Sequence, residues 1–447
     1  MRFILHNPHA LWYKMTLGSF FIKTKPVVKY EYLFDYLYND KRKKMYVYLD
    51  NANFATSPKG LLARFKTPLL KFYIWVFINK LNPYRFKIVK DIEKLNGDDI
   101  LFTFLHINFT NITGKFDIPR EPFIEKFRKT KAFKVVNLSH YGYNTGLGSK
   151  NAKEADIDLF VSENNLAKNS SFFQHYYKWY NKDVYVLPFV PQKRFIKTMK
   201  FEKRKNKAIA MGTITFPMAD NDFIHFFKDN KLQPMRHAIF NNAKKLEDFI
   251  DSYISQITEN AQSTNRDLQG INVRSNKLYR IDFNKYIEKI KRLFSFLMLP
   301  FRILTVILRR KRNVTIGSKE RQYYKFDIVS KYNEYKMFVC PEEIIDLPGI
   351  GFVEGMACGN AFLGIRDPMY SDLGLIDGEH YIGYNGTIED LKEKIEYYQN
   401  NPIELEEIAK RGYKFVMEKF NENVVCEKFL ADIERLCFTN QKTQNSL

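Results

Sequence analysis

A glycine-rich turn between two acidic residues is the segment of this sequence that could best support catalysis or ligand binding. It reads DLPGIGFVEGMACG, from Asp346 to Gly359. Gly349 and Gly351 precede an apolar run that predicts a short helix over Phe352–Cys358. Free backbone N–H groups and the positive end of a helix suit a phosphate group, and glycine lets a ligand approach the backbone closely. The turn therefore indicates a phosphate site.

The two carboxylates lie eight positions apart, on either side of this turn. Glu354 falls in the first turn of the predicted helix, where its carboxylate could accept hydrogen bonds from ribose hydroxyls. Asp346 precedes the glycines and would face the group that the phosphate carries. The small residues after Glu354 permit close packing of the helix on a sheet, and a glycine turn before a helix is also common in α/β proteins that bind no ligand.

Short apolar runs alternate with helical segments along both halves of the chain, a pattern that predicts parallel strands in doubly wound sheets. A helix is expected over Val27–Asp40, and the charged stretch Gln192–Lys207 is expected to link two domains. The expected strands are Arg2–His6, Met45–Asp50, Asp98–His106, Phe133–His140, Asp158–Ser162 and Val184–Phe189 in the first half, and Ala208–Thr213, Tyr335–Pro341 and Asn360–Ile365 in the second.

The composition points to an anionic partner. The 447 residues carry a net charge of +21, and 45% of them are hydrophobic, which is ample for folded cores. The four cysteines have no metal-ligand spacing and are expected to be buried free thiols. The N-terminal segment MRFILHNPHALWYKM is too polar for a signal peptide. A cytoplasmic location is expected.

A basic and apolar segment in the second half suggests contact with a membrane surface. Lys289–Lys319 holds nine basic residues and no acidic one, and its centre, Leu293–Leu308, is apolar. Sixteen residues containing Pro300 and Arg302 are too few to span a bilayer, which takes roughly 20. The pattern favours interfacial binding to anionic lipid through about 289–312, with a buried kinked helix as the alternative. Thr67–Arg85 could be a second interfacial helix or a core helix.

The segment around the two carboxylates resembles the C-terminal domain of GT-B-fold glycosyltransferases, in particular the large retaining family that uses nucleotide sugars. That signature is a strand ending in Pro, an acidic residue, a glycine turn, and a Glu eight positions later that leads into a small-residue helix. The resemblance is strong over Tyr323–Phe420. In the first half, VVNLSHYGYNTG resembles the family strand that ends in a His near the sugar.

The resemblance implies a role for each matching residue. Glu354 would bind the ribose, Asp346 the donor sugar, and the amides of Gly349, Ile350 and Gly351 the diphosphate or sugar. His140 would support the developing oxocarbenium ion. The family usually has Glu in place of Asp346, and it places an Arg and a Lys after the strand Ala208–Thr213, where this chain has neither. Arg236 is the nearest candidate for the cation that stabilises the leaving diphosphate.

The resemblance also implies a GT-B architecture of two Rossmann-like domains facing a cleft. Residues 1–195 would bind the acceptor, 196–420 would bind the nucleotide sugar and carry a helical basic insertion at about 216–325, and 421–447 would form a C-terminal helix and tail. The expected activity moves a sugar to a glycan or lipid-linked acceptor in cell-surface polysaccharide or glycolipid synthesis, on the inner face of the cell membrane. No cofactor or metal is expected, since GT-B enzymes generally need no metal and the chain shows no Asp-x-Asp motif that would hold Mg²⁺ beside a diphosphate.

Three alternatives are also consistent with the sequence. Retention of configuration is favoured by resemblance, whereas an inverting enzyme, such as one like the fucosyltransferases, needs a general base, for which Asp117, Glu121, Glu125 and Glu163 are candidates. A nucleotide-sugar epimerase could use the same fold. A basic nucleic-acid-binding protein is the alternative in another class, but no known nucleic-acid-binding motif occurs and no nucleic acid is expected as a partner.

Overall fold

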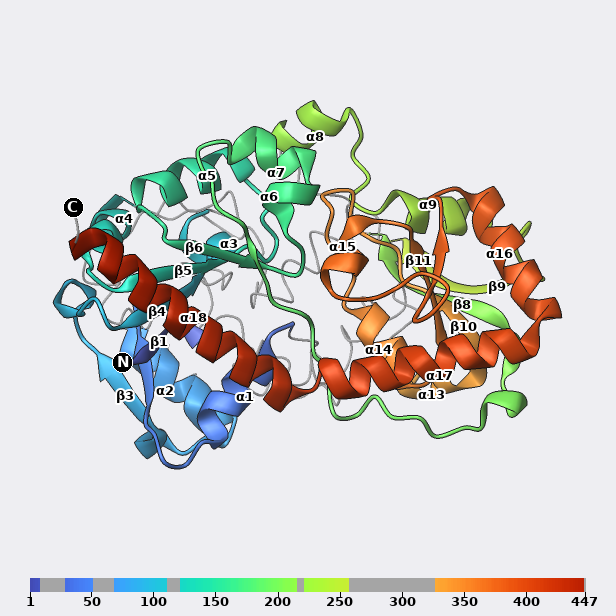
Figure 1. Cartoon of the computed structure of the whole chain (residues 1–447), viewed down its shortest axis with the longest axis horizontal. Helices are drawn as coiled ribbons and strands as arrows, with labels where there is room; N and C mark the ends of the chain where they lie inside the picture. The colour runs from blue at the N-terminus through green and yellow to red at the C-terminus, as the bar shows by residue number, and fades with distance from the viewer. Residues whose placement is uncertain (9–28, 51–67, 111–120, 215–220, 257–325, 446–447) are drawn as a thin grey trace, which may run out of the picture.

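Two parallel sheets, each covered by helices, form two Rossmann-like domains side by side (Figure 1). The structure is a computed structural model that describes residues 1–8, 29–50, 68–110, 121–214, 221–256 and 326–445. The expected doubly wound α/β class is confirmed. The basic segment Lys289–Lys319 lies outside the described residues.

The N-terminal sheet has seven strands in the order β3-β2-β1-β4-β5-β6-β7, and every neighbouring pair is parallel. The central strands β4 and β5 are buried along their whole length, as expected of a sheet covered on both faces. The direction of winding reverses between β1 and β4. The strands are β1 (Phe3–His6), β2 (Met45–Tyr48), β3 (Phe86–Val89), β4 (Ile100–Phe104), β5 (Phe133–Asn137), β6 (Leu159–Ser162) and β7 (Tyr185–Val186).

The C-terminal sheet has five parallel strands in the order β12-β11-β10-β8-β9, and its winding reverses between β8 and β10. The strands are β8 (Lys205–Ile214), β9 (Ile250–Gln256), β10 (Tyr335–Val339), β11 (Ala361–Ile365) and β12 (Ile382–Tyr384). The helices of the second half are α8 (Asn221–Phe227), α9 (Pro234–Asn241), α13 (Ile328–Glu334), α14 (Gly351–Ala357), α15 (Pro368–Asp372), α16 (Ile388–Asn400), α17 (Pro402–Lys419) and α18 (Glu422–Asn445).

The helices of the first half are shorter, and the first expected one differs from the prediction. The helix expected over Val27–Asp40 begins at Glu31 among the described residues. The helices are α1 (Glu31–Asn39), α2 (Pro68–Ile78), α3 (Leu105–Asn108), α4 (Glu121–Lys129), α5 (Thr145–Glu154), α6 (Leu166–Asn169) and α7 (Ser171–Tyr176).

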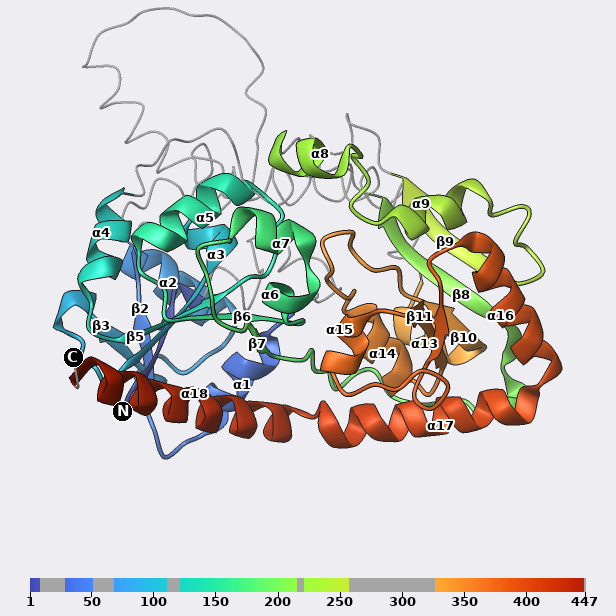
Figure 2. The same cartoon turned by 45° about the horizontal axis from the view of Figure 1, so that its top comes forward.

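Helix α8 belongs to the second half of the chain but packs on the N-terminal domain, next to α7 (Figures 1 and 2). Phe227 stacks on Phe172 at 5.1 Å between ring centroids. The Asp222 carboxylate accepts a hydrogen bond of 2.8 Å from the Gly146 amide, and the Asp222 carbonyl accepts one from the Tyr176 hydroxyl at 2.9 Å. The chain therefore crosses between the domains after β8.

Helix α18 crosses back in the opposite sense. It continues from the end of α17 and lies along the N-terminal domain (Figure 2). Phe429 is fully buried there, with its ring 6.2 Å from Phe3, 5.9 Å from Phe102 and 5.6 Å from Tyr185. The residues expected to form a C-terminal helix thus complete the core of the first domain.

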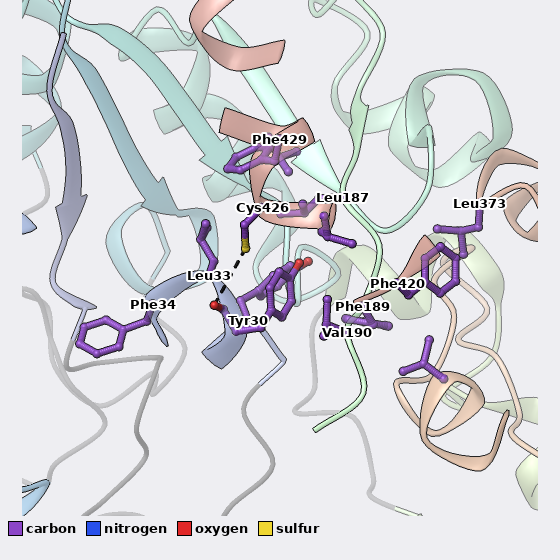
Figure 3. Close-up of a cluster of buried hydrophobic side chains, with 14 of the residues drawn as sticks. Tyr30, Leu33, Phe34, Leu187, Phe189, Val190, Leu373, Phe420, Cys426 and Phe429 are labelled. Atoms are coloured by element: carbon purple, nitrogen blue, oxygen red, sulfur yellow. Dashed lines mark hydrogen bonds between the residues drawn. The ribbon is translucent and has the colours of Figure 1, made fainter. Parts of the chain in front are cut away.

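One apolar cluster runs through the junction of the two domains (Figure 3). Tyr30 beside α1, Phe429 of α18 and Phe189 of the connection after β7 meet Phe420 and Leu373 from the C-terminal domain. Phe189 also contacts the Phe352 ring of α14 at 6.5 Å between centroids. The two domain cores are therefore continuous through the connection.

Helix α2, within the segment Thr67–Arg85, has one buried face and one exposed apolar face. Phe72 and Trp75 are buried against the N-terminal core. Leu69, Tyr73 and Phe77, spaced four residues apart, lie on one exposed face, and Phe77 is 83% exposed. Among the described residues, no helix has both the length and the apolar character required to span a bilayer.

Truncating Phe429 tests the role of α18. Phe429→Ala should lower the free energy of unfolding by about 3–5 kcal/mol, because it leaves a cavity between α18 and the first sheet. The matched control is Phe438→Ala on the same helix, whose side chain is 46% exposed and should change stability by less than about 0.5 kcal/mol. Urea unfolding measures both values, and equal effects would contradict this packing.

Candidate donor site

The candidate site lies at the carboxyl ends of the strands, where each sheet reverses its winding. Ligands of open α/β sheets bind in the crevice at that point. In the C-terminal sheet the reversal lies between β8 and β10, so Gly212 and Thr213 at the end of β8 face the segment that follows β10. That segment carries Cys340 and then the glycine turn. The turn that the sequence singled out is therefore at the expected edge.

The glycines of the turn are required by packing. A Cβ at Gly349 would lie 2.7 Å from the Cys340 sulfur, and a Cβ at Gly351 would lie 2.9 Å from the same atom. Helix α14 begins at Gly351, one residue before the predicted start, and Ile350 is its N-cap. A Cβ at Gly355 would enter the Phe338 ring at 2.5 Å, so the expected close packing of this helix on the sheet is confirmed.

Glu354 is a buried carboxylate with one oxygen that has no hydrogen-bond partner among the described residues. Its side chain is on α14, the residue is 3% exposed, and its Oε1 has no hydrogen-bond partner among the described residues. Burial raises the pKa of Glu354 to about 8, and the positive charge of Arg194 opposes that shift. A buried acceptor without a donor is unfavourable in the free protein, so the site is suited to a ligand hydroxyl.

Arg236 lies at the end of β8, within α9. Its Nη1 donates a 3.1 Å hydrogen bond to the Thr213 carbonyl, and a Cβ at Gly212 would lie 2.8 Å from its Cζ. Gly212 has a φ of 146°, in the region that favours glycine. Burial raises the pKa of Cys340 to about 12 while the Arg236 charge opposes it, so this cation acts on the residue against the glycine turn. Sequence reasoning could nominate Arg236 but could not show this proximity.

Asp346 lies in a strained turn. Its φ is 62°, a left-handed conformation that is uncommon for a residue other than glycine. Burial raises the pKa of the Asp346 carboxyl to about 6; hydrogen bonding from the Ser170 hydroxyl opposes this shift and the charge of Asp367 adds to it. Strained residues held by their surroundings are often functional.

His140 is in a turn after β5, three residues beyond the end of the strand that was expected to include it. Its φ is 58°, and its ring lies 5.0 Å from the His106 ring. The next residues reach the C-terminal domain, because the Tyr141 hydroxyl donates to the Ile345 carbonyl at 2.8 Å. The structure therefore brings the His140 turn and the Asp346 turn together across the domain boundary.

A buried polar cluster at the reversal point of the first sheet was missed by the sequence analysis. The His6 Nδ1 lies 2.9 Å from the Thr103 hydroxyl, and Asn7 Nδ2 donates to Asp50 at 2.7 Å. Asn108 donates to the same Thr103 hydroxyl at 2.7 Å. Asn7 has a φ of 49°. These residue types occur singly at strand ends and form no motif, so only their common place in the fold reveals them.

The general-base candidates separate by location. Glu163 follows β6 and is fully buried, with its Oε2 3.2 Å from the Ser162 hydroxyl. Glu125 is exposed and paired with Lys129 at 2.7 Å. Asp117 and the side chain of Glu121 lie outside what the structure describes. Of the two candidates whose side chains the structure describes, only Glu163 lies at the carboxyl edge of the sheet.

The buried carboxyl of Glu342, between β10 and α14, is a titratable group that the sequence did not single out. Its Oε1 accepts hydrogen bonds from the Tyr370 hydroxyl at 2.6 Å and from the Ile365 amide at 3.0 Å. Burial raises its pKa to about 7.

All four cysteines are buried free thiols, as expected. No group of three potential metal ligands occurs in the part of the chain that the structure describes.

Comparisons with known proteins give one family match and several solved structures of similar fold. A protein-family model described as "Glycosyl transferase-like" matches residues 287–431. A search among curated proteins finds no match. Among solved structures, a glycosyltransferase from Rickettsia africae ESF-5 is 12% identical and covers 97% of this chain and 98% of its own, with a TM-score of 0.44.

Two further solved structures are similar over nearly the whole chain. HepE of Anabaena in complex with UDP and glucose is 11% identical and covers 97% of this chain and 100% of its own, with a TM-score of 0.45. The sucrose-phosphate synthase of Thermosynechococcus elongatus is 9% identical and covers 98% of this chain and 100% of its own, with a TM-score of 0.48.

The class of protein follows from the family match together with the fold. The matched residues include α14 and the whole Asp346–Glu354 segment, so the C-terminal part of the chain is similar to a glycosyl transferase-like domain. Two Rossmann-like domains with this segment at the carboxyl edge of the second sheet support a GT-B glycosyltransferase. The expected resemblance and the enzyme class are confirmed.

The buried charge of Glu354 gives a pH-dependent prediction. The unfolded chain releases this proton near pH 4.5 and the folded chain near pH 8, so the group's contribution to stability is full below pH 4.5 and is lost as pH rises to 8. Glu354→Gln cannot lose a proton. It should raise the melting temperature by roughly 3–6 °C at pH 9 and leave it unchanged near pH 4.5.

A thermal melt series from pH 4.5 to 9 measures this difference. The matched control is Glu418→Gln, an exposed residue on α17, which should follow the wild type at every pH. A constant offset between Glu354→Gln and the wild type across the series would contradict the assignment of a buried acidic group.

Proposed function

We propose that this protein transfers a sugar from a nucleotide-diphosphate sugar to a glycan or lipid-linked acceptor, with retention of configuration. The observation that carries the proposal is Glu354, a buried carboxylate one helical turn from a glycine turn, with an oxygen to which none of the described residues donates. Vicinal ribose hydroxyls would donate hydrogen bonds to such a carboxylate. The family match of residues 287–431 supports the same reaction class.

Four groups would divide the work at the donor. Glu354 binds the ribose, and the amides of Gly349–Gly351 lie beside the diphosphate. Arg236 carries the positive charge that the leaving diphosphate needs, since it is already directed to the end of β8 by the Thr213 carbonyl. Asp346 accepts hydrogen bonds from the sugar, which requires its ionised form.

The reaction needs no carboxylate nucleophile in this scheme. The bond between the sugar anomeric carbon and the phosphate oxygen breaks, and the acceptor oxygen forms its bond to that carbon on the same face. The acceptor proton passes to the departing phosphate oxygen. His140, held in a strained turn next to the Asp346 turn, would face the positive charge that develops on the sugar ring. The polar cluster of His6, Asn7 and Asp50 is our candidate for the acceptor side.

Peripheral association with an anionic membrane belongs to the same proposal. The basic segment at about 289–312 supplies the charge, and the exposed face of α2 formed by Leu69, Tyr73 and Phe77 supplies apolar side chains. Each Lys or Arg near an anionic surface contributes about 1 kcal/mol. The proposed setting is the synthesis of cell-surface polysaccharide or glycolipid on the inner face of the cell membrane.

A thermal-shift screen tests the donor site. UDP, GDP and ADP and their glucose derivatives are compared on the wild type and on Glu354→Ala. One nucleotide family should raise the wild-type melting temperature by several degrees, and Glu354→Ala should weaken its binding at least tenfold, the loss of about 1.4 kcal/mol of hydrogen bonding.

Variants of two arginines provide the test and the control for this screen. Arg236→Gln should weaken diphosphate binding, whereas Arg435→Gln, an exposed α18 residue, should not. Equal responses of wild type and Glu354→Ala would remove the ribose assignment. Salt-sensitive binding to RNA or DNA with no nucleotide response would favour the nucleic-acid alternative, and rearrangement of the free nucleotide sugar would favour an epimerase.

Vesicle sedimentation tests the membrane proposal. Replacing Arg309, Arg310, Lys311 and Arg312 with Gln should weaken binding to phosphatidylserine vesicles by at least tenfold at low salt. Tyr73→Ser with Phe77→Ser should weaken it independently. The matched control is Phe438→Ser, an exposed aromatic on α18, and undiminished binding of the basic variant would contradict the proposal.

A further inference from the structure

Two side chains of the N-terminal domain hold the Asp346 turn. The Tyr141 hydroxyl donates to the Ile345 carbonyl at 2.8 Å, and Asn164 Nδ2 donates to the Asp346 carbonyl at 2.9 Å. These are consecutive carbonyls at the point where the backbone takes the left-handed φ of 62°. Both donors are fully buried. Each lies about 200 residues before its acceptor, at separations of 204 and 182 positions.

The donors are themselves fixed by neighbouring groups. Asn169 Nδ2 donates to Asn164 Oδ1 at 2.7 Å, which leaves the Asn164 amide nitrogen directed at the Asp346 carbonyl. Asn169 also donates to the Asp372 carboxylate on α15 at 2.7 Å. The network therefore begins and ends in the C-terminal domain and passes through two N-terminal asparagines. Such a chain has one arrangement in which all its members are satisfied.

The Ser170 hydroxyl connects this network to the carboxylate. It lies 3.2 Å from the Tyr141 hydroxyl and is fully buried, and its hydrogen bonding lowers the pKa of the Asp346 carboxyl. The space behind the contact is closed, because a Cβ at Gly142 would lie 2.9 Å from the Ile345 side chain. The N-terminal domain thus contacts both the backbone and the side chain of the Asp346 turn.

We infer that Tyr141, Asn164 and Ser170 are positioning residues that place the Asp346 carboxylate only when the two domains are closed on each other. The inference rests on the proposed function of Asp346 as the sugar-binding carboxylate. Its consequence is that Glu354 and Arg236, which belong to the C-terminal domain, can bind the nucleotide in either state. Recognition of the sugar then requires the closed state. Strain at Asp346 is held by contacts that opening would remove.

Three variants with one matched control test the inference. Tyr141→Phe removes one hydroxyl and keeps the ring, Asn164→Leu removes the donor, and Ser170→Ala removes the hydroxyl beside the carboxylate. The control is Tyr32→Phe, which removes another largely buried hydroxyl, one that donates to the Pro188 carbonyl at 2.8 Å away from Asp346. Hydrogen exchange of the 343–351 segment should be faster in Tyr141→Phe and Asn164→Leu and unchanged in Tyr32→Phe.

Binding and turnover supply the functional part of the test. The probes are UDP, GDP and ADP with their glucose derivatives. Tyr141→Phe and Asn164→Leu should keep the affinity for the nucleoside diphosphate within twofold. They should lose about 3–10-fold of the extra affinity for the nucleotide sugar, the range expected for one net hydrogen bond. The turnover rate of the nucleotide sugar, measured as release of the nucleoside diphosphate, should fall by a similar or larger factor.

The pH profile separates positioning from a general structural effect. The turnover rate of the nucleotide sugar should rise with pH as the Asp346 carboxyl ionises. It should be half-maximal near the Asp346 pKa of about 6. Ser170→Ala removes a hydrogen bond that lowers this pKa, so its midpoint should move upward, while the neighbouring charge of Asp367 is unchanged and Tyr32→Phe leaves the midpoint in place. An unmoved midpoint in Ser170→Ala would contradict the role of the hydroxyl.

The two proposals fail in different ways. If no nucleotide binds the wild type, the proposed function fails, and the exchange experiment still decides whether the N-terminal residues hold the turn. If the wild type binds and turns over a nucleotide sugar while Tyr141→Phe and Asn164→Leu match Tyr32→Phe in exchange and in sugar affinity, the positioning inference is overturned and the donor site stands.

Discussion

The continuous apolar core at the domain junction is the constraint on which the rest of the structure depends. Phe189 and Phe420 join the first core to the second, and α18 closes the junction from the outside. Burial of such side chains contributes about 1.5–3 kcal/mol each, which is large beside any single polar contact between the domains. The hydrophobic junction therefore sets the approximate placement of the two sheets, and the polar contacts adjust it.

The polar contacts are concentrated where the carboxyl ends of the two sheets meet. Three carboxyl groups there, Glu342, Asp346 and Glu354, have their pKa values raised by burial to between about 6 and 8. Groups in this range change charge near neutral pH, and each lowers the stability of the fold when it ionises. Groups whose pKa values are strongly shifted cluster at functional sites. The well-packed core around these groups offsets this local loss of stability.

The sequence alone predicted most of the strands and the donor segment, because both depend on short-range patterns. Largely apolar runs such as those of β4 (ILFTF) and β10 (YKMFV) predict buried strands. Strand β9, with the sequence IDSYISQ, falls within the insertion that the sequence predicts at about 216–325, because it lies at a sheet edge and carries four polar residues. Strands β3 and β12 are short edge strands and were missed for a related reason.

The candidate site was predictable only on its local side. Asp346 and Glu354 belong to one short segment, so their spacing is visible in the sequence. The partners of Asp346 lie in another domain, and no local pattern connects Tyr141 to Ile345. Likewise, His6, Asn7 and Thr103 become a cluster only because β1 and β4 are neighbours in the sheet. Tertiary topology decides these contacts.

Helix α18 has a consequence for the order in which the protein folds during synthesis. The first sheet is complete once β7 has been made, but the face that Phe3 and Phe102 present to Phe429 stays uncovered until residues 422–445 have left the ribosome. The entire C-terminal domain is synthesised in that interval. The N-terminal domain must therefore wait with an exposed aromatic surface, a condition under which nascent chains depend on chaperones.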